Sequence, residues 1–321
     1  MSTGTQLKYI DTGSMGDIVL GHKPRVGVLM SAYNGNRYLM EQIETIAAQE
    51  GVDVVLYVRD DGSRDETREM LVEVSRAPMG CIASWIVDLG DNVGFLGSFE
   101  KLLMSADGCD FYAFSDQDDF WLPNKLACAV AALETSCADL YASSVEVVDE
   151  SLSPIGRNDF PGLAYTIPAE LIRHRLAGHN MVWTAGLQRG ILRLGSLPCW
   201  SHDQHVVLAS LLADKGMVFD KASYVLHRRL RNSVTPGGAG LAKRLRHEFR
   251  MMWNPGLAWN RAALAGSILE LGYCDLRDSD MRFLLKCANR KRLSLVRDPS
   301  FDCGLALGNF EARLSVMLGR F

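Results

Sequence analysis

Short apolar runs alternate with segments of helical spacing through the first 135 residues, and this rhythm limits the fold more than any other feature. The runs Val26–Met30, Val54–Val58 and Phe111–Phe114 have the length and composition of buried parallel strands. Between them, apolar residues recur at helical spacing, as in Leu39–Ala47 and Gly94–Ala106. This alternation predicts an α/β fold with a mixed, mainly parallel sheet flanked by helices.

Polar and aromatic residues stand where these strands are expected to end. They are Tyr33-Asn34, Asp60-Asp61 and the stretch Asp116–Asp119. Ligands of open α/β sheets bind beyond the carboxyl ends of the strands. We therefore expect a binding site at these three places.

The second half of the chain is less regular. Strands are expected over 140–148, 180–184 and 217–227, and a buried helix over 206–213. A segment rich in Gly at 235–240 predicts a flexible break. The first residues lack sustained periodicity. We therefore expect a loose arm over 1–24, one domain over 25–235 and a mostly helical C-terminal extension over 236–321.

Composition and charge exclude several classes of protein. The 321 residues carry a formal net charge of -4, which gives no case for binding nucleic acid. The balance is uneven, because the first 150 residues contain 10 basic and 25 acidic side chains. Eight scattered Cys without a CxxC motif favour reduced thiols. Without a secretory signal or a long apolar run, the expectation is a soluble cytoplasmic protein.

The stretch Asp116-Gln117-Asp118-Asp119 is the sharpest chemical feature. Three carboxylates in four residues repel one another unless a cation or hydrogen bonds compensate. At a strand end they could hold Mg²⁺ or Mn²⁺, which favour oxygen ligands and substrate phosphates. A solvated acidic loop is the alternative, although the neighbouring Phe120 and Trp121 do not suit one.

The second strand end, Asp60-Asp61-Gly62-Ser63, could contact a base or ribose. Ser63 and Glu66 have the spacing of a capping box, which would explain Ser63 but neither Asp. Tyr33 could stack on a nucleobase or simply pack. The absence of GxGxxG, GxxxxGK[ST] and GxSxG motifs disfavours dinucleotide, P-loop and serine-hydrolase chemistry.

Together these segments resemble the inverting glycosyltransferases of family two, which have the GT-A fold. The motifs that carry the resemblance, in the order of the family, are Ser31-Ala32-Tyr33-Asn34-Gly35, Asp60-Asp61-Gly62-Ser63-Arg64-Asp65, Asn92-Val93-Gly94-Phe95 and Ser115-Asp116-Gln117-Asp118-Asp119-Phe120-Trp121. Three further pieces are similar to the bacterial rhamnosyltransferase-like branch: the continuation Pro123-Asn124-Lys125, the segment Gly178-His179-Asn180-Met181, and His202-Asp203 before an apolar helix. The resemblance covers roughly residues 25–235.

The resemblance implies a role for each matching position. The residues implied to contact the donor nucleotide are Ser31, Ala32, Tyr33, Asp60, Asp61, Asn92, Asp116 and Gln117. Asp116 and Asp118 match the motif that holds a divalent metal and the diphosphate, with Asp118 as the direct ligand. Asp203 matches the general base, which agrees with the need to deprotonate an acceptor hydroxyl. Capping of a helix is the alternative role for Asp203.

The chain departs from the family at the end of the last expected strand. Leu230 stands where the family commonly has a His that reaches the metal or diphosphate, which puts a His ligand in doubt. Arg228, Arg229 or Arg231 could meet the diphosphate instead, since Arg pairs bidentately with phosphate oxygens. A solvated basic strand end is the alternative.

A basic amphipathic segment follows at 241–253. Such a helix can lie on an anionic membrane surface, or it can pack on the catalytic domain with its charges outward. A membrane contact would suit an enzyme whose acceptor is a lipid-linked glycan.

The sequence thus predicts a metal-dependent transferase that uses a dTDP- or UDP-sugar, with rhamnose as the favoured sugar by resemblance. Its acceptor would be a cell-surface polysaccharide or a lipid-linked glycan. A sugar-phosphate nucleotidyltransferase would need a Gly-rich, Arg-bearing loop that Ser31–Asn36 is not. A glycan-binding protein on a decayed transferase fold is the other alternative, although uncompensated buried acids are costly without a ligand.

Overall fold

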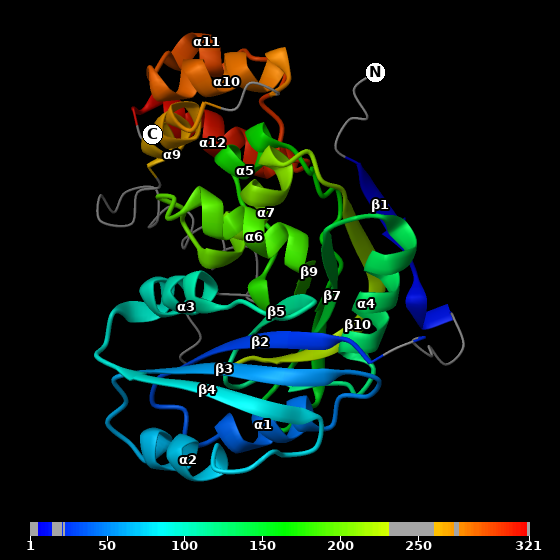
Figure 1. Ribbon diagram of the computed structural model, residues 1–321. Helices are drawn as coiled ribbons and strands as arrows, with labels where there is room; N and C mark the ends of the chain where they lie inside the picture. Colours follow the sequence, from blue (N-terminus) through cyan, green and yellow to red (C-terminus); the bar gives the residue numbers. More distant parts are fainter. Residues whose placement is uncertain (1–5, 15–20, 22, 231–259, 273–275, 320–321) are drawn as a thin grey trace.

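Within the described residues, a ten-stranded sheet forms the centre of the protein (Figure 1). The computed structural model describes residues 6–14, 21, 23–230, 260–272 and 276–319. The strands are β1 (Leu7–Ile10), β2 (Arg25–Ala32), β3 (Asp53–Asp61), β4 (Ile82–Gly90), β5 (Phe111–Ser115), β6 (Phe120–Trp121), β7 (Leu140–Val148), β8 (Pro154–Asn158), β9 (Met181–Thr184) and β10 (Met217–Arg228). The predicted mixed, mainly parallel sheet is confirmed.

The order along the sheet is β1-β10-β7-β9-β5-β2-β3-β4, with β6 paired to β10 and β8 paired to β7. Strands β2, β3, β4 and β5 run parallel, as the alternation with helices predicts. The short β9 lies antiparallel between β5 and β7, and it joins the two halves of the sheet.

Helices cover both faces of the sheet. The helices of the described residues are α1 (Leu39–Ala47), α2 (Thr67–Val74), α3 (Gly94–Ser105), α4 (Lys125–Ser136), α5 (Ile167–Ile172), α6 (Ala185–Leu194), α7 (His202–Leu212), α9 (Arg261–Glu270), α10 (Asp278–Ala288), α11 (Arg292–Val296) and α12 (Ala306–Met317), of which the last four lie beyond α5 rather than on the sheet. Figure 1 shows α1 and α2 on one side of the sheet and α3, α6 and α7 on the other.

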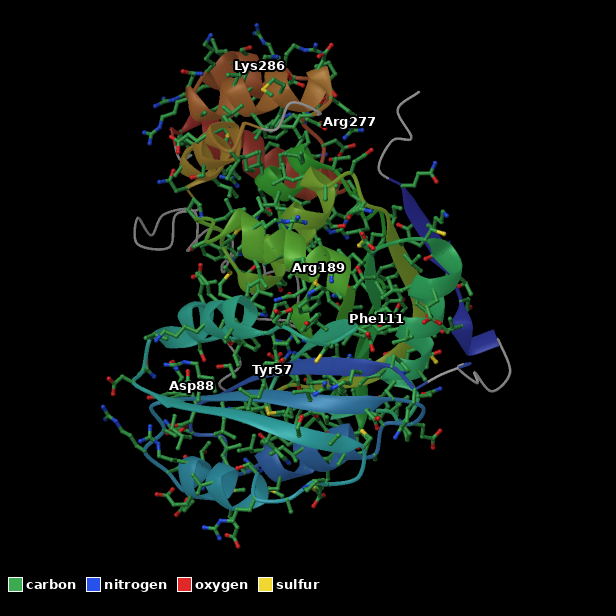
Figure 2. The ribbon with its side chains drawn as sticks, viewed as in Figure 1. Tyr57, Asp88, Phe111, Arg189, Arg277 and Lys286 are labelled. Carbon is green, nitrogen blue, oxygen red and sulfur yellow. The ribbon has the colours of Figure 1, made fainter. Side chains whose placement is uncertain are left out.

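Strand β5 shows why both faces are apolar. Successive side chains of a strand point to opposite faces. Phe111 and Ala113 accordingly lie in the core beneath α1 and α4, whereas Tyr112 and Phe114 lie in the core shared with α3 and α7. Side chains fill the space between the sheet and the helices on both of its faces (Figure 2). A continuous apolar run, rather than an alternating one, is therefore what the chain needs here.

The C-terminal helices pack on α5 rather than standing apart. Arg261 donates from Nε to the carbonyl of Leu171 at 2.9 Å and from Nη2 to that of Ile172 at 3.1 Å. Leu264 and Phe283 are buried in the same core as α5 and α7. The predicted helical C-terminal extension is thus present, although its boundary at 236 and the basic segment 241–253 lie outside the described residues.

The N-terminal arm is partly incorporated in the sheet, where a loose arm was expected for 1–24. Strand β1 pairs parallel with β10 at the edge of the sheet. Just beyond it, the amide of Thr12 donates to Asp220 Oδ1 at 3.1 Å, and Tyr141 donates to Asp220 Oδ2 at 3.0 Å. Four residues are too few for a sequence pattern to predict this strand, and its partner lies some 200 residues away in the chain.

The capping box of Ser63 and Glu66 does not form, because α2 begins at Thr67 and the Ser63 hydroxyl accepts from the amide of Asn34 instead, at 2.9 Å. In the part of the chain that the structure describes, no helix has the length and apolar character needed to cross a bilayer.

Candidate active site

The carboxyl ends of β2, β3 and β5 meet at one edge of the sheet. Ala32 is in register with Asp60 of β3, and Met30 is in register with Ser115 of β5. The residues that follow these strands therefore converge, as the sequence predicts. The chain must turn sharply here, and Asn34 adopts a left-handed conformation with φ of 49°.

The first two strand-end loops are tied together. Asn34 Oδ1 accepts from the amide of Arg64 at 2.8 Å, and the amide of Gly35 donates to Thr67 Oγ1 at 2.8 Å. Gln117 adds a third link, because its side-chain amide accepts from the Tyr33 N–H at 2.8 Å and donates to the Tyr33 carbonyl at 3.2 Å. The backbone of this loop is thereby held while the Tyr33 ring stays 44% exposed.

Asp60 and Asp61 are both buried, and each already has partners. Asp61 accepts from the amides of Val93 and Gly94, each at 2.9 Å, and so holds the start of α3. Asp60 accepts from Arg68 Nε at 3.1 Å. Asp61 is thus placed to stabilise the fold, and Asp60 is the one with an exposed cationic neighbour at the site.

The other residues predicted to contact the nucleotide lie around this loop. Ser31 donates from its hydroxyl to that of Ser98 at 2.6 Å, and Ala32 is fully buried. Asn92 is exposed next to Gly62, where a Cβ would approach the Asn92 amide nitrogen to 2.8 Å. The predicted residues therefore lie together, but only some present side chains to solvent.

Four side chains gather at the end of β5 in an arrangement that could hold a metal ion: Asp116, Asp119, His179 and His227. Their ligand atoms lie within 4.8 Å of one another. His179 Nδ1 lies 3.3 Å from Asp116 Oδ2, and His227 Nδ1 lies 2.8 Å from Asp119 Oδ1. We call these four residues the Asp/His cluster.

Two buried atoms of the Asp/His cluster lack a hydrogen-bond partner among the described residues, Asp119 Oδ2 and His179 Nε2. Asp119 is fully buried, and His179 is 8% exposed. Unpaired buried polar atoms are costly, and a carboxylate oxygen with a neutral imidazole nitrogen is a donor set that divalent cations take. The residues present therefore fit a cation.

Charge within the site shifts several pKa values. Burial raises the pKa of Asp118 to about 7, with Asp116 and Asp119 adding like-charge repulsion. Burial also opposes the charged form of Asp116, but His179 and His227 outweigh it and lower its pKa. Burial opposes the charged form of His227 as well, but the carboxylate of Asp119 outweighs it and raises the pKa of His227 to about 9. The site carries excess negative charge that a cation would relieve.

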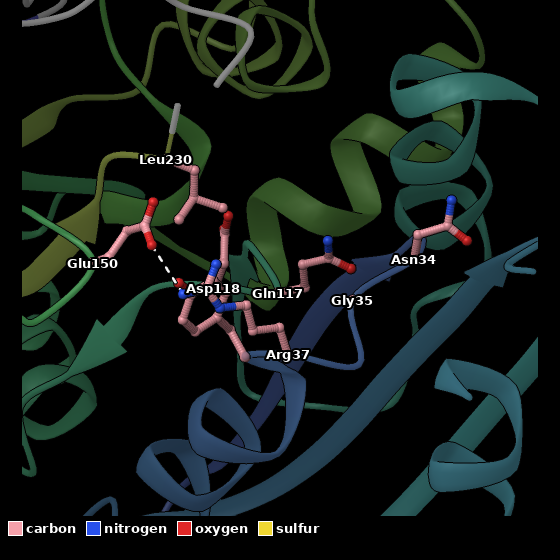
Figure 3. Close-up of a pocket in the computed structure, with 8 residues that line it drawn as sticks. Asn34, Gly35, Arg37, Gln117, Asp118, Glu150 and Leu230 are labelled. Atoms are coloured by element: carbon pink, nitrogen blue, oxygen red, sulfur yellow. Dashed lines mark hydrogen bonds and ion pairs between the residues drawn. The ribbon is translucent and has the colours of Figure 1, made fainter. Parts of the chain in front are cut away.

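Asp118 lies outside the Asp/His cluster and lines an adjoining cavity of about 350 Å³ (Figure 3). The other lining residues are Asn34, Gly35, Arg37, Tyr38, Gln117, Glu150 and Leu230. Arg37 forms an ion pair with Glu150 at 2.9 Å across the cavity. Of the metal ligands predicted from the sequence, Asp116 belongs to the Asp/His cluster and Asp118 faces this cavity beside it.

The end of β10 carries the residues about which the sequence left alternatives. Arg228 is buried, pairs with Glu41 at 2.6 Å and lies over the ring of Tyr38 at 4.2 Å. Its Nε and Nη1 atoms make no hydrogen bond among the described residues. Burial lowers the pKa of Arg229. Arg231 lies outside the described residues.

Asp203, the predicted base, lies in the first turn of α7. Its Oδ2 accepts from the amide of Gly178 at 3.0 Å, and its Oδ1 lies 3.2 Å from His174 Nε2. Ser201, not Asp203, is the N-cap residue of α7. Asp203 Oδ1 nevertheless accepts from the backbone amide of Gln204 in the first turn at 2.9 Å, so this carboxylate also stabilises the start of the helix. Burial would raise the pKa of Asp203, but the neighbouring His174 holds it well below the usual range.

Gly178 belongs to the short 3-10 helix η2 (Gly178–Asn180), and this turn joins the two parts of the site. Its first residue holds Asp203 and its second, His179, belongs to the Asp/His cluster. The buried carboxylate of Asp203 and the Asp/His cluster are thus connected through the consecutive residues Gly178 and His179.

Comparisons with known proteins agree with this geometry. The profile of Glycosyl transferase family 2 matches residues 27–193. The chain belongs to this glycosyltransferase family. The family predicted from the sequence motifs is therefore confirmed, and with it the GT-A fold.

Individual relatives of the family 2 chain are distant. The dTDP-rhamnosyl transferase RfbG of Shigella flexneri is 29% identical over 160 residues, which are 44% of this chain and 55% of RfbG. The β-1,3-glucosyltransferase WfgD of Escherichia coli is 23% identical over 194 residues, or 60% and 71% of the two chains. The chain thus spans about half the length of RfbG.

Among solved structures, residues 1–349 of S. aureus TarS in complex with UDP-GlcNAc superpose with a TM-score of 0.55. The match covers 91% of this chain and 79% of the TarS chain at 15% identity. At that identity the likeness concerns the fold of the family 2 chain.

Sequence reasoning missed Asp119, His179 and His227 as a set. For His227 the signal was present, because it lies at the end of a predicted strand, where the rule on carboxyl ends applies. His179 precedes β9 and reaches the same edge because β9 runs antiparallel to β5, which local sequence does not indicate. The family comparison directed attention to Leu230, three residues beyond, whereas this chain brings His227 to the site.

Proposed function

We propose that the chain is an inverting glycosyltransferase that moves a sugar from a nucleoside-diphosphate donor to a cell-surface polysaccharide or a lipid-linked glycan. The observation that carries this proposal is the turn η2, which connects Asp203 to the Asp/His cluster. Such a reaction needs a base for the acceptor hydroxyl and positive charge beside the leaving diphosphate. The candidate base is held by the amide of Gly178 in this turn, and the candidate cation site includes His179 of the same turn.

The relatives support the choice of substrates. RfbG is named a dTDP-rhamnosyl transferase, so rhamnose from dTDP-rhamnose is the proposed donor sugar. WfgD is named for UDP-Glc and a diphosphoundecaprenol-linked GlcNAc, which supports a UDP-sugar as the second donor and a lipid-linked acceptor. An acceptor of that kind would bring the enzyme to the cytoplasmic face of a membrane, with residues 241–253 as the proposed contact.

Asp203 is the proposed general base. It removes the proton of the acceptor hydroxyl while the acceptor oxygen bonds to the anomeric carbon. The bond from that carbon to the diphosphate oxygen breaks, and the electron pair leaves with the nucleoside diphosphate. A single displacement inverts the anomeric configuration, as it does in inverting glycosidases.

The Asp/His cluster is the proposed holder of the divalent cation, with Asp118 beside it at the cavity. When bound, a divalent cation supplies Lewis-acid stabilisation of the charge that develops on the diphosphate. Tyr33 and Asp60 are proposed for the nucleoside, the first by its exposed ring and the second by its place at the strand end. Arg37 lines the cavity and is an added candidate for the diphosphate.

The test is release of nucleoside diphosphate from dTDP-rhamnose and from UDP-glucose, with Mn²⁺ or Mg²⁺ and a lipid-linked acceptor. We expect Asp203→Asn to lower kcat by about 10²-fold or more, because general base catalysis contributes on that order. His205→Gln is the matched control, since His205 is a buried residue of the same helix outside the site. It should retain turnover.

Other outcomes distinguish the alternatives. Pyrophosphate release would indicate a nucleotidyltransferase. Donor binding without turnover across a panel of acceptors would indicate a glycan-binding protein on a transferase fold. Equal activity of Asp203→Asn and the wild type would remove Asp203 from the role of base.

A further inference from the structure

A line of three buried ionisable side chains leads away from the site: Asp203, His174 and Glu170. Glu170 lies on α5, His174 follows that helix and Asp203 lies on α7. The side chains of His174 and Glu170 are 6% and 3% exposed, and that of Asp203 is 11% exposed. Neither His174 nor Glu170 belongs to the Asp/His cluster or to the motifs that identify the family.

The imidazole of His174 bridges the two carboxylates. Its Nδ1 lies 2.6 Å from Glu170 Oε2, within hydrogen-bond distance, and its Nε2 lies 3.2 Å from Asp203 Oδ1, an ion-pair contact. A direct bond between α5 and α7 supports this geometry, because the side-chain Nε2 of Gln204 on α7 donates to the backbone carbonyl of Glu170 on α5 at 2.8 Å. A ring between two acids is protonated on both nitrogens when each acid is ionised.

No other cation among the described residues makes an ion pair with Asp203. His202, its neighbour on α7, is buried against Phe99, with ring centroids 4.0 Å apart, and burial lowers its pKa. Other ionisable groups also surround His174, Asp203 and His202 and interact with them or with one another electrostatically. They are Glu170 of α5, Glu100 of α3, Asp116 after β5, His179 of η2 and Cys199 before α7.

The charge balance gives this line a function. A buried carboxylate without compensation takes up a proton as the pH falls, and a protonated Asp203 could not act as a base. His174 supplies the compensating charge. Glu170 and Asp203 together raise the pKa of His174 to about 10 although burial opposes this, so the ring stays charged at neutral pH.

We propose that His174, held by Glu170, is a positioning residue that keeps the Asp203 carboxylate ionised and fixed beside the acceptor site. The inference rests on the proposed role of Asp203 as base and adds what keeps that base competent. It assigns Glu170 a place two contacts away from the chemistry.

The pH profile of kcat/KM separates this role from a structural one. In the wild type, the acidic limb that reports protonation of Asp203 should lie below the range in which the protein is folded. In His174→Gln, Asp203 is still buried but lacks its cation, so its pKa should rise and the limb should appear. We expect kcat/KM of this variant at pH 5.5 to fall about tenfold below its value at pH 8.

Glu170→Gln and His205→Gln complete the series. Glu170→Gln keeps the ring but removes one of its two acids, so we expect an upward shift of the limb smaller than in His174→Gln. His205→Gln also replaces a buried His of α7, but one without a hydrogen bond or ion pair to Asp203 among the described residues, and should keep the wild-type profile. The donor KM should stay unchanged in all three. Unmoved acidic limbs in both His174→Gln and Glu170→Gln would overturn the proposal.

Nitrogen NMR of the His side chains tests the inference without substrate, and therefore independently of the proposed activity. His174, assigned by its absence in His174→Gln, should show both nitrogens protonated at pH 8, and Asp203→Asn should lower its pKa. A His174 ring that is neutral at pH 7 would overturn the proposal even in an active enzyme. A charged His174 in a protein without transfer activity would contradict the proposed function alone.

Discussion

The imidazole rings of His179 and His227 stack face to face, with their centroids 4.5 Å apart and an angle of 9° between their planes. The two residues come from η2 and from the end of β10, which the sequence separates by almost 50 residues. Each ring also contacts a different carboxylate, His179 that of Asp116 and His227 that of Asp119. Both rings belong to the Asp/His cluster, and a divalent cation takes imidazole as a ligand in its neutral form.

Loss of one ring should therefore weaken cation binding. We expect His227→Leu to raise the Mn²⁺ concentration for half-maximal activity by about tenfold or more, on the scale of losing a partner in a metal site. Mn²⁺ binding followed by electron paramagnetic resonance gives the same comparison without substrate. His205→Gln is the control for loss of a buried His. An unchanged Mn²⁺ response in His227→Leu would exclude the ring as a ligand.

Asp61 should matter for stability more than for catalysis. Its carboxylate accepts from the amides of Val93 and Gly94 at the start of α3, in the manner of a helix cap. Removal of such a cap costs about 0.5–2 kcal/mol, and Asp61 also forms an ion pair with the buried Arg59 at 3.5 Å. We therefore expect Asp61→Ala to lower the free energy of unfolding by at least that amount. Denaturant titration measures the change, and donor affinity measured on the folded variant should remain close to wild type. A large loss of affinity without a loss of stability would instead make Asp61 a nucleotide contact.

Much of this site follows from local sequence. The apolar runs of β2, β3 and β5 predict a parallel sheet, and the parallel arrangement brings Asp60 and Asp116 to one edge. The partners of those residues do not follow from local sequence. That Asp61 holds α3, and that His227 rather than a residue at 230 reaches Asp119, depends on contacts between distant segments.

The N-terminal strand shows the same limit. The four residues Leu7–Ile10 form a strand because they pair with β10, since so short a segment is not stable as a strand by itself. The hydrogen bonds of Asp220 beyond it likewise depend on residues far apart in the chain. Sequence periodicity does not predict such tertiary contacts, because it depends only on residues that are close together along the chain.

Gly35 should be sensitive to the addition of a single methyl group. A Cβ there would lie 2.3 Å from Gln117 Oε1, so Gln117 would have to move and release the backbone of Tyr33. We expect Gly35→Ala to raise the donor KM severalfold while kcat changes little, because the loop that carries the Tyr33 ring loosens. Gly190→Ala on α6 is the control, since a Cβ meets nothing within 4 Å there, and it should stabilise the helix by about 0.5–1 kcal/mol. An unchanged donor KM in Gly35→Ala would show that Gln117 does not support this loop.

Asp118 should make the metal-free protein less stable as the pH rises. Burial and two neighbouring carboxylates raise its pKa in the folded state to about 7, against 3.8 as the ordinary value. Between these values the folded state binds more protons than the unfolded state, so stability falls with increasing pH. Asp118→Asn removes the titration. Relative to wild type in EDTA, its free energy of unfolding should be similar at pH 4 and higher by up to about 3–4 kcal/mol at pH 7.5, at about 1.4 kcal/mol for each unit of pKa.

The comparison within each pH value cancels the titration of the other groups in the site. Added Mn²⁺ should narrow the difference at pH 7.5, because a cation stabilises the ionised carboxylates of the wild type and binds only the folded state. Denaturant titrations at the two pH values, each with and without Mn²⁺, measure the difference in the free energy of unfolding between Asp118→Asn and the wild type under all four conditions. A pH-independent difference between Asp118→Asn and the wild type would mean that the Asp118 carboxylate is solvated in the folded protein and ionises with its ordinary pKa.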